Sequence, residues 1–252
     1  MPVPDPVYPA LVVAVCLLLA GLTYRKRVLD LHGSALGFFL ALIIGLFGHL
    51  YWLFLLLIFL ITSFVATRYK YSLKEKLQVA EPRGGTRGFA SVLANGWVPM
   101  VVALLSFENP WVSTFPKGVA AILFLTALSA AAADTIASEL GVLSDRAYLI
   151  TNFSRVKPGT NGGVSALGTA AALGAAVYTS AIGWVVIWFT GELAAFPVSY
   201  ILIPISMGFI GCNIDSLLGA TLENRGKLNK DRVNILSIGA ATLMALAVLM
   251  LI

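Results

Sequence analysis

Long runs of hydrophobic residues, separated by short polar segments, repeat from one end of the chain to the other. Runs of this length are typical of helices that cross a bilayer, because lipid offers no water to satisfy an open backbone. The pattern therefore predicts an all-α fold, a polytopic transmembrane helix bundle. We expect about eight spans, at roughly 8–24, 31–48, 50–67, 89–106, 117–141, 163–189, 196–221 and 233–252. The run at 163–189 is long enough for one tilted helix, but a break near Gly183 would change the count.

The composition supports a membrane protein with no separate soluble part. Of the 252 residues, 59% are hydrophobic and only 12% are charged, whereas about a quarter are charged in a typical soluble domain. We therefore expect one integral-membrane domain over residues 1–252. Cys16 and Cys212 both lie in apolar runs, which gives neither a disulfide framework nor a metal-ligand spacing.

The basic residues fall almost entirely on one side of this eight-span arrangement. Of the 17 lysines and arginines, only Lys117 lies in a loop on the other side. The positive-inside rule makes the basic side cytoplasmic and both termini external, in the cell membrane if the organism is a prokaryote. Basic residues 25–27 follow the first run rather than precede it, which indicates a retained helix and not a cleaved signal peptide. The net charge of +5 is thus a signal of topology, and we expect no nucleic-acid partner.

Polar residues are expected at one depth inside these spans. Counting at 1.5 Å per residue places Asn95, Asp134 and Asp215 roughly 10 Å below the cytoplasmic face. Ionised groups in hydrocarbon are costly and usually face a protein interior or a wet cavity. We therefore predict a shared polar pocket, with Ser138 on the helix face of Asp134 and Ser216 beside Asp215. Asn95 and Ser138 could instead only hydrogen-bond neighbouring helices, as polar residues in membrane bundles often do.

The two aspartates suit a magnesium ion. Mg²⁺ prefers one or two carboxylates together with waters and phosphate oxygens. Glu139 is a further candidate ligand, although it lies roughly 140° from Asp134 on an ideal helix and reaches the same site only if the helix bends or ends near Gly141. With no histidine or cysteine expected at this site, zinc and redox iron are not expected either.

Three basic, glycine-bearing loops flank the predicted acidic layer. Residues 155–163 read RVKPGTNGG and precede a span; glycines let the backbone approach an anion, and a helix N-terminus presents free N–H groups. A plain turn would look the same, and the Walker A pattern is absent. The stretches 81–96 and 213–234 also place lysines or arginines beside glycines. Acids for a metal and bases for phosphates together favour phosphoryl transfer, which depends on positioning and charge neutralisation.

The depth of the predicted site indicates its partners. A site between helices, near one face of the bilayer, can admit a lipid head group while the lipid tail stays in the membrane. A soluble nucleotide would enter from the cytoplasm. We therefore expect a lipid phosphate, a nucleotide and the surrounding membrane lipids as partners.

Four stretches resemble a known family: RGGTRGFASVLANG, AAADTIASELG, KPGTNGGVS and NIDSLLGATLEN. Over about residues 30–250 the chain is similar to the transmembrane protein 19 family, which includes the plant phytyl-phosphate kinases. The resemblance implies an integral-membrane kinase that converts a prenyl monophosphate, of phytyl or geranylgeranyl type, to the diphosphate with a nucleoside triphosphate. Related phytol and dolichol kinases use CTP, so CTP is the expected donor.

A more distant similarity is to phosphatidate cytidylyltransferases. It rests on the order Asp134, then KPGT at 157–160, then Asp215-Ser216, then Lys230-Asp231. The Gly-His-Gly-Gly stretch that closes the pattern in those enzymes is absent here, which counts against their chemistry. A prenol kinase and a lipid cytidylyltransferase stay open as alternatives. So does a membrane transporter, although no internal repeat is evident.

These arguments assign roles within residues 83–232, the predicted catalytic core with its cytoplasmic loops, between plain helices over 1–70 and a last helix over 233–252. The predicted catalytic groups are Asp134, Asp215, Lys157 and Lys230, and the predicted metal ligands are Asp134, Asp215 and Glu139. The predicted nucleotide- or substrate-binding groups are Arg83, Arg87, Asn95, Ser138, Gly159, Thr160, Asn161, Gly162, Gly163, Ser216 and Asp231.

Overall fold

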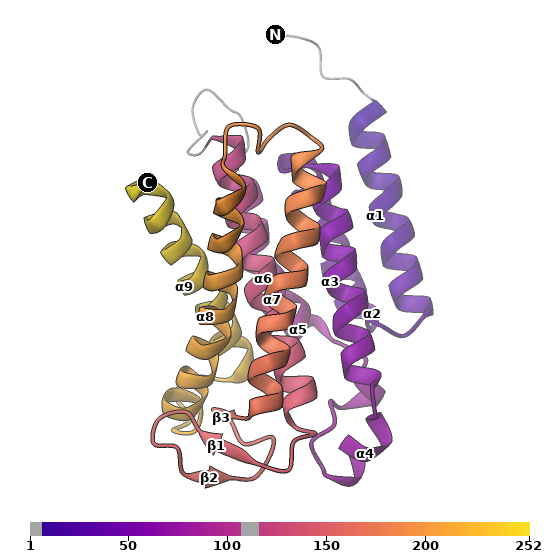
Figure 1. The fold of residues 1–252 in the computed structure, drawn as a ribbon. Coiled ribbons are helices and arrows are strands. Elements are labelled where there is room, and N and C mark those ends of the chain that lie inside the picture. Colours follow the sequence, from indigo (N-terminus) through magenta and orange to yellow (C-terminus); the bar gives the residue numbers. More distant parts are fainter. Residues whose placement is uncertain (1–6, 107–115) are drawn as a thin grey trace.

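The computed structural model describes residues 7–106 and 116–252, and within these ranges eight long helices run side by side (Figure 1). They are α1 (Val7–Arg25), α2 (Leu31–Phe47), α3 (Leu50–Arg68), α5 (Phe89–Ser106), α6 (Lys117–Gly141), α7 (Ala166–Trp188), α8 (Leu202–Leu218) and α9 (Lys230–Leu251). Seven of these helices are long and apolar enough to cross a membrane. The eighth, α2, is also apolar but has only 17 residues. Helix α7 runs unbroken through Gly183, so the run at 163–189 forms one span. The predicted polytopic helix bundle is confirmed.

Helix α6 is the centre of the bundle. It packs against α3, α5, α7, α8 and α9, and its residues 120–133 are buried throughout. Small residues let these neighbours approach closely, since a Cβ at Gly183 would collide with Leu125 and one at Gly208 with Ser129. Close contact through small residues is how membrane helices associate. By contrast, α1 lies at the periphery and packs chiefly against α2 (Figure 1).

One end of the bundle carries a small antiparallel sheet that the hydrophobic pattern did not predict. Its strands are β1 (Ala147–Leu149), β2 (Arg155–Val156) and β3 (Gly163–Val164), in the order β2-β1-β3. Because β3 occupies the start of the expected 163–189 helix, α7 begins only at Ala166, where the Ser165 side chain accepts a hydrogen bond from the Gly168 N–H. The short helix α4 (Tyr71–Lys76) and the turn η1 (Arg83–Gly85) lie at the same end.

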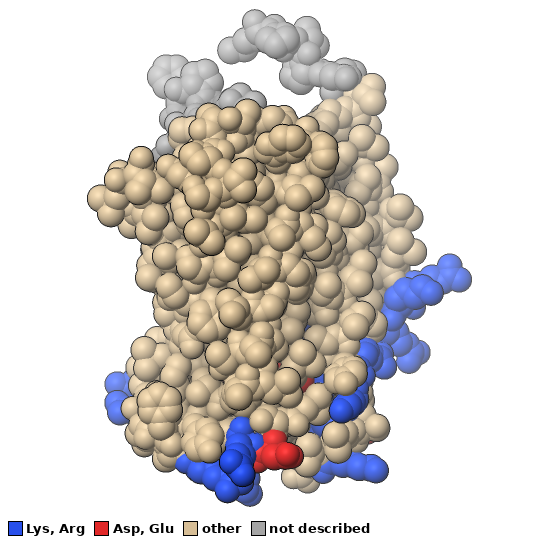
Figure 2. Space-filling view, in the orientation of Figure 1, with Lys and Arg blue, Asp and Glu red and all other residues tan. Residues whose placement is uncertain are grey.

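Charged side chains gather at this sheet end. Figure 2 shows lysines and arginines around the sheet and α4 and at the turn after α1, while the rest of the visible face carries neither sign of charge. Helix α1 begins, and α9 ends, toward the opposite end (Figure 1). The charge bias seen in the sequence is therefore a property of one end of the folded bundle. Which end faces the cytoplasm stays a prediction, as does the division into plain helices and a catalytic core.

Candidate functional site

A cavity of about 260 Å³ opens at the sheet end of the bundle. Its walls come from α6, α8, the starts of α7 and α9, the turn between β2 and β3, and residues 78–81. Eleven of the 16 candidate residues line it: Asp134, Ser138, Glu139, Gly159, Thr160, Asn161, Gly162, Gly163, Asp215, Ser216 and Lys230. Cys212 also lines the cavity, although no cysteine was expected at the site.

The cavity brings Asp134 and Asp215 together through the packing of α6 against α8. A Cβ at Gly211 would lie 3.0 Å from the Cβ of Ala130, so the two helices approach closely there. Asp215 comes one turn after Gly211, and Asp134 comes one turn after Ala130. The same close packing therefore carries both acids to one cavity, where the two carboxyl groups interact electrostatically.

Helix α9 orients Asp215 with two side chains that the sequence arguments missed. The Ser237 hydroxyl donates to Asp215 Oδ2 at 2.9 Å. The Asn234 amide, turned so that its nitrogen faces the acid, donates to the same oxygen at 3.2 Å. A signal was available, because Asn234 and Ser237 are three residues apart and share one face within an apolar stretch of α9. Glu223, also missed, lines the cavity and adds a third acid near the pair.

The aspartate pair fits a divalent cation. Two neighbouring carboxyl groups inside a membrane either share a proton, so that only one is ionised, or are both ionised and hold a cation. Within the described ranges, no cluster of three or more His, Cys, Asp or Glu side chains forms a complete metal site. Mg²⁺ does not need one, because it commonly takes one or two carboxylates and completes its shell with water and phosphate oxygens.

The glycine-rich turn between β2 and β3 is held against the end of α8. Gly159 and Gly162 have φ of +85° and +75°, a backbone conformation that glycine adopts without strain. A Cβ at Gly162 would lie 2.6 Å from the Cα of Ala220, in the π-helical turn η3 (Gly219–Glu223). The Asn224 amide donates to the Asn161 carbonyl at 3.1 Å. The turn that lines the cavity is thus fixed to the segment that follows Asp215.

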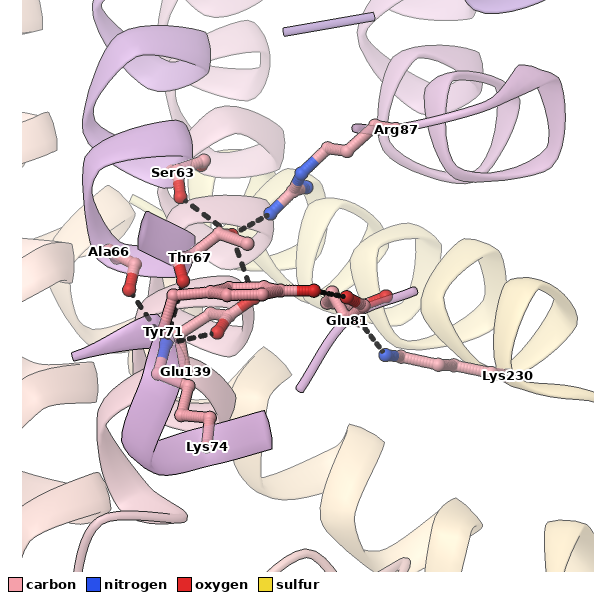
Figure 3. A network of polar contacts seen from close by, with 9 residues as sticks. All are labelled: Ser63, Ala66, Thr67, Tyr71, Lys74, Glu81, Arg87, Glu139 and Lys230. Atoms are coloured by element: carbon pink, nitrogen blue, oxygen red, sulfur yellow. Dashed lines mark hydrogen bonds and ion pairs between the residues drawn. The ribbon is translucent and has the colours of Figure 1, made fainter. Parts of the chain in front are cut away.

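Glu139 has a different partner from the aspartates. Its carboxylate accepts from Lys74 Nζ at 2.6 Å and from the Thr67 hydroxyl at 2.7 Å. Figure 3 shows the Lys74 amine also donating to the Ala66 and Thr67 carbonyls, and its side chain is fully buried. Although Glu139 lines the cavity, its charge is matched by Lys74, so the structure corrects the view that it completes the metal site with Asp134.

Lys230 is held at the cavity wall by Glu81. The Lys230 amine donates to Glu81 Oε1 at 2.6 Å, and the Glu81 carbonyl accepts from the Tyr71 hydroxyl at 2.7 Å (Figure 3). Burial acts to raise the pKa of Glu81, but the charge and hydrogen bond of Lys230, with Arg87 nearby, outweigh it and hold that pKa below its ordinary value. The start of α9 and the segment after α4 are thereby joined across the cavity.

Five candidate residues do not line this cavity. Arg83 pairs with Asp30 at 2.9 Å on the surface, and Asn95 donates to the Ser91 carbonyl and lines a second cavity. Lys157 and Asp231 lie outside the cavity wall. The shared layer predicted for Asn95 and the two aspartates therefore includes only the aspartates, because α5 turns Asn95 toward α2. Arg87 also lines the second cavity.

Comparison with known proteins places the chain in a family. The model of the family described as "Integral membrane protein DUF92" matches residues 14–246. "Uncharacterized membrane protein MJ0933" of Methanocaldococcus jannaschii is 32% identical over 90% of this chain and 87% of that protein. "Protein PGR" of Arabidopsis thaliana is 32% identical over 83% of this chain and 77% of that protein. "Protein VTE6, chloroplastic" of the same plant is 29% identical over 72% of this chain and 53% of that protein.

No solved structure shows a significant match to the chain. The family match covers almost the whole bundle, including every element around the cavity. It also agrees with the four stretches that carry the sequence resemblance. The chain belongs to the DUF92 family of integral membrane proteins, the family of the transmembrane protein 19 and phytyl-phosphate kinase proteins that its motifs resemble.

Proposed function

We propose that the protein is a membrane kinase that transfers a phosphoryl group from a nucleoside triphosphate to a prenyl monophosphate, giving the diphosphate. CTP is the expected donor, and the acceptor is of phytyl or geranylgeranyl type. The observation that carries the proposal is the meeting of Asp134 and Asp215 in one cavity beneath a glycine-rich turn. The family resemblance and the similarity to VTE6 support the same class of reaction.

The cavity residues suit the parts of phosphoryl transfer. Asp134 and Asp215 would hold Mg²⁺, which when bound neutralises charge on the donor phosphates. The N–H groups of Thr160 and Gly163 donate to carbonyls within the turn, which leaves those of Gly159, Asn161 and Gly162, together with the Lys230 amine, to bind phosphate oxygens. An oxygen of the acceptor phosphate attacks the γ-phosphorus, the bond from that phosphorus to the β–γ bridging oxygen breaks, and the nucleoside diphosphate leaves. The acceptor phosphate is already ionised near neutral pH, so the reaction needs no strong general base.

The direct test is transfer by purified protein in detergent. Each radiolabelled nucleotide is offered with phytyl and with geranylgeranyl monophosphate, and the expected products are a nucleoside diphosphate and a prenyl diphosphate. Asp134→Asn and Asp215→Asn should each lower kcat by roughly 100-fold or more, because each removes charge on which the transition state depends. Asp145→Asn is the matched control, since Asp145 is exposed just after α6 and does not line the cavity.

The products also decide between the proposal and its alternatives. Pyrophosphate with a cytidylylated lipid would identify a cytidylyltransferase, and labelled monophosphate from a free prenol would identify a prenol kinase. A transporter would show no substrate-dependent nucleotide consumption in detergent. Near-wild-type turnover in either aspartate variant would reject the metal role of that residue.

A further inference from the structure

A second cavity, of about 130 Å³, lies among α1, α2, α3 and α5. Its wall is mostly apolar, with leucines from α1, α2 and α3 together with Phe38, Ile44 and Phe59. Ser34 and Ile44 both line it and are ten residues apart on α2, which at 1.5 Å per residue is roughly 15 Å along the bundle. The cavity is therefore long and apolar, with its polar residues at the sheet end.

Polar groups at that end lack partners. Ser34 and Asn95 are 5% and 7% exposed, and neither Ser34 Oγ nor Asn95 Oδ1 has a hydrogen-bond partner among the described residues. Buried polar atoms without partners are costly and rare in folded proteins. Arg87 lines the same end of the cavity. A ligand with a polar head would satisfy these groups.

Most N–H groups of the Arg87 guanidinium have no hydrogen-bond partner among the described residues. A guanidinium carries five N–H donors, but Arg87 makes one long side-chain bond, from Nη2 to the Thr67 hydroxyl at 3.4 Å (Figure 3). In the described part of the chain no carboxylate comes within salt-bridge distance of it. Its backbone is fixed, because its N–H donates to the Val28 carbonyl and its carbonyl accepts from the Asp30 N–H, both at 3.0 Å.

Arg87 also stands between the two cavities. It lines the apolar cavity, yet its charge interacts with Asp134, Glu139 and Glu81, all of which line the acidic one. Burial lowers the pKa of Arg87 and these carboxylates oppose that shift, while a guanidinium stays protonated in any case. Thr67 joins Arg87 to Glu139, which lines the acidic cavity, so a phosphate on Arg87 would lie near the wall between the two cavities.

We propose that the apolar cavity holds the hydrocarbon chain of the prenyl phosphate acceptor and that Arg87 binds its phosphate. This subsite rests on the proposed kinase function and adds the place of the acceptor to it. The ligand and the cavity match in charge and polarity. The anionic phosphate would bind the end with Arg87, Ser34 and Asn95, and the apolar prenyl chain would fill the rest of the cavity. A membrane phospholipid fits less well, since its phosphate is esterified on both sides and offers fewer free oxygens to a guanidinium.

Photo-crosslinking of the wild-type protein tests the location directly. The probe is geranylgeranyl monophosphate with a diazirine at the far end of its chain. We expect cross-linked peptides from α2, α3 or α5 around Ile44, Leu53 and Gly96, which line the cavity, and competition by unlabelled geranylgeranyl monophosphate but not by excess phosphatidylglycerol. Labelling confined to the outer bundle surface, or lost to phosphatidylglycerol, would overturn the subsite.

Two matched variants of α2 test the same point by kinetics. Ala41 lines the cavity, whereas Ala35 on the same helix is exposed and does not. Ala41→Phe should lower kcat/KM for geranylgeranyl monophosphate by roughly tenfold or more, which is the cost of about 1.4 kcal/mol of lost binding. Its effect on the shorter geranyl monophosphate and on the KM for nucleotide should be small. Ala35→Phe should match the wild type with every substrate.

The Arg87→Gln variant tests whether Arg87 binds the prenyl phosphate acceptor or the nucleotide donor. It should raise the KM for the acceptor by roughly tenfold or more while leaving the KM for nucleotide close to wild type, because a charged partner of phosphate is lost. Equal effects on both substrates would overturn the assignment of Arg87. If the wild type transfers phosphate to no prenyl phosphate, the kinase proposal fails, and the cross-linking pattern still decides whether the cavity binds a prenyl phosphate.

Discussion

At the scale of the residue, two acids on α6 have neighbours of opposite charge. Asp134 and Glu139 lie within six residues on α6, but Asp134 meets another carboxyl group and Glu139 meets an amine. The two side chains are five residues apart on a helix with 3.6 residues per turn, so they leave it in different directions and meet different neighbours. Glu139 is one half of a structural ion pair, whereas among the described residues no lysine or arginine lies within salt-bridge distance of Asp134. That contrast is the reason to propose a metal ion at Asp134 and Asp215 and not at Glu139.

The pair of Lys74 and Glu139 should dominate local stability. Lys74→Met leaves a buried carboxylate without its cation and should lower the free energy of unfolding by about 3–5 kcal/mol. Arg83→Met breaks an exposed pair, with 72% of the Arg83 side chain accessible, and should cost about 0–1 kcal/mol. Thermal unfolding in detergent measures both, and the double variant Lys74→Met, Glu139→Gln should recover most of the loss. A loss in Lys74→Met as small as that in Arg83→Met would contradict the buried pair.

At the scale of the element, the spans were predictable and the sheet was not. Hydrophobic runs long enough to cross a bilayer stand out in the sequence, and a helix is present in every expected span. Strands of two or three residues carry no readable period, so the sheet and the late start of α7 at Ala166 were missed. The aspartates could be found because charges in apolar helices are rare. The partners of Glu139 and Asn95 depend on how helices rotate and pack, which the sequence alone does not display.

The docking of the glycine turn on η3 can be tested with two glycines of similar backbone. Gly162 and Gly226 both have positive φ, but a Cβ would crowd Ala220 only at Gly162, and nothing lies within 4 Å at Gly226. Each change to alanine should cost about 1–2 kcal/mol of stability from the backbone conformation. Only Gly162→Ala should also raise the KM for nucleotide, by roughly tenfold, because it displaces the turn from the cavity.

Nucleotide titrations of both purified variants, compared with their melting temperatures, separate the two effects. Equal losses of nucleotide affinity in the two variants would mean that general destabilisation, and not displacement of the turn, is responsible. An unchanged KM in Gly162→Ala would remove the turn from the proposed phosphate site. The control is informative because Gly226 lies outside the cavity wall.

At the scale of the whole molecule, the bundle has two chemically different ends. The sheet end carries the acidic cavity and the basic loops. The opposite end carries a small cluster in which His49 pairs with Glu192 at 2.6 Å and the Tyr51 hydroxyl bonds the same carboxylate. This cluster joins the turn after α2 to the segment after α7 and satisfies its own charges. The basic end is therefore the one expected to face the cytoplasm, where nucleoside triphosphates are found.

Cysteine labelling in intact bacterial cells tests this orientation. Cys16 and Cys212 are buried, so the background should be low. Ser154→Cys places a thiol in the exposed β1–β2 turn, and Val198→Cys places one at the start of η2 (Val198–Ile201), where Val198 is 69% exposed at the other end. A membrane-impermeant maleimide should label Val198→Cys in intact cells and Ser154→Cys only after the cells are opened. Labelling of Ser154→Cys from outside would place the cavity on the side that lacks cytoplasmic nucleotide, and the kinase proposal would then fail together with the predicted topology.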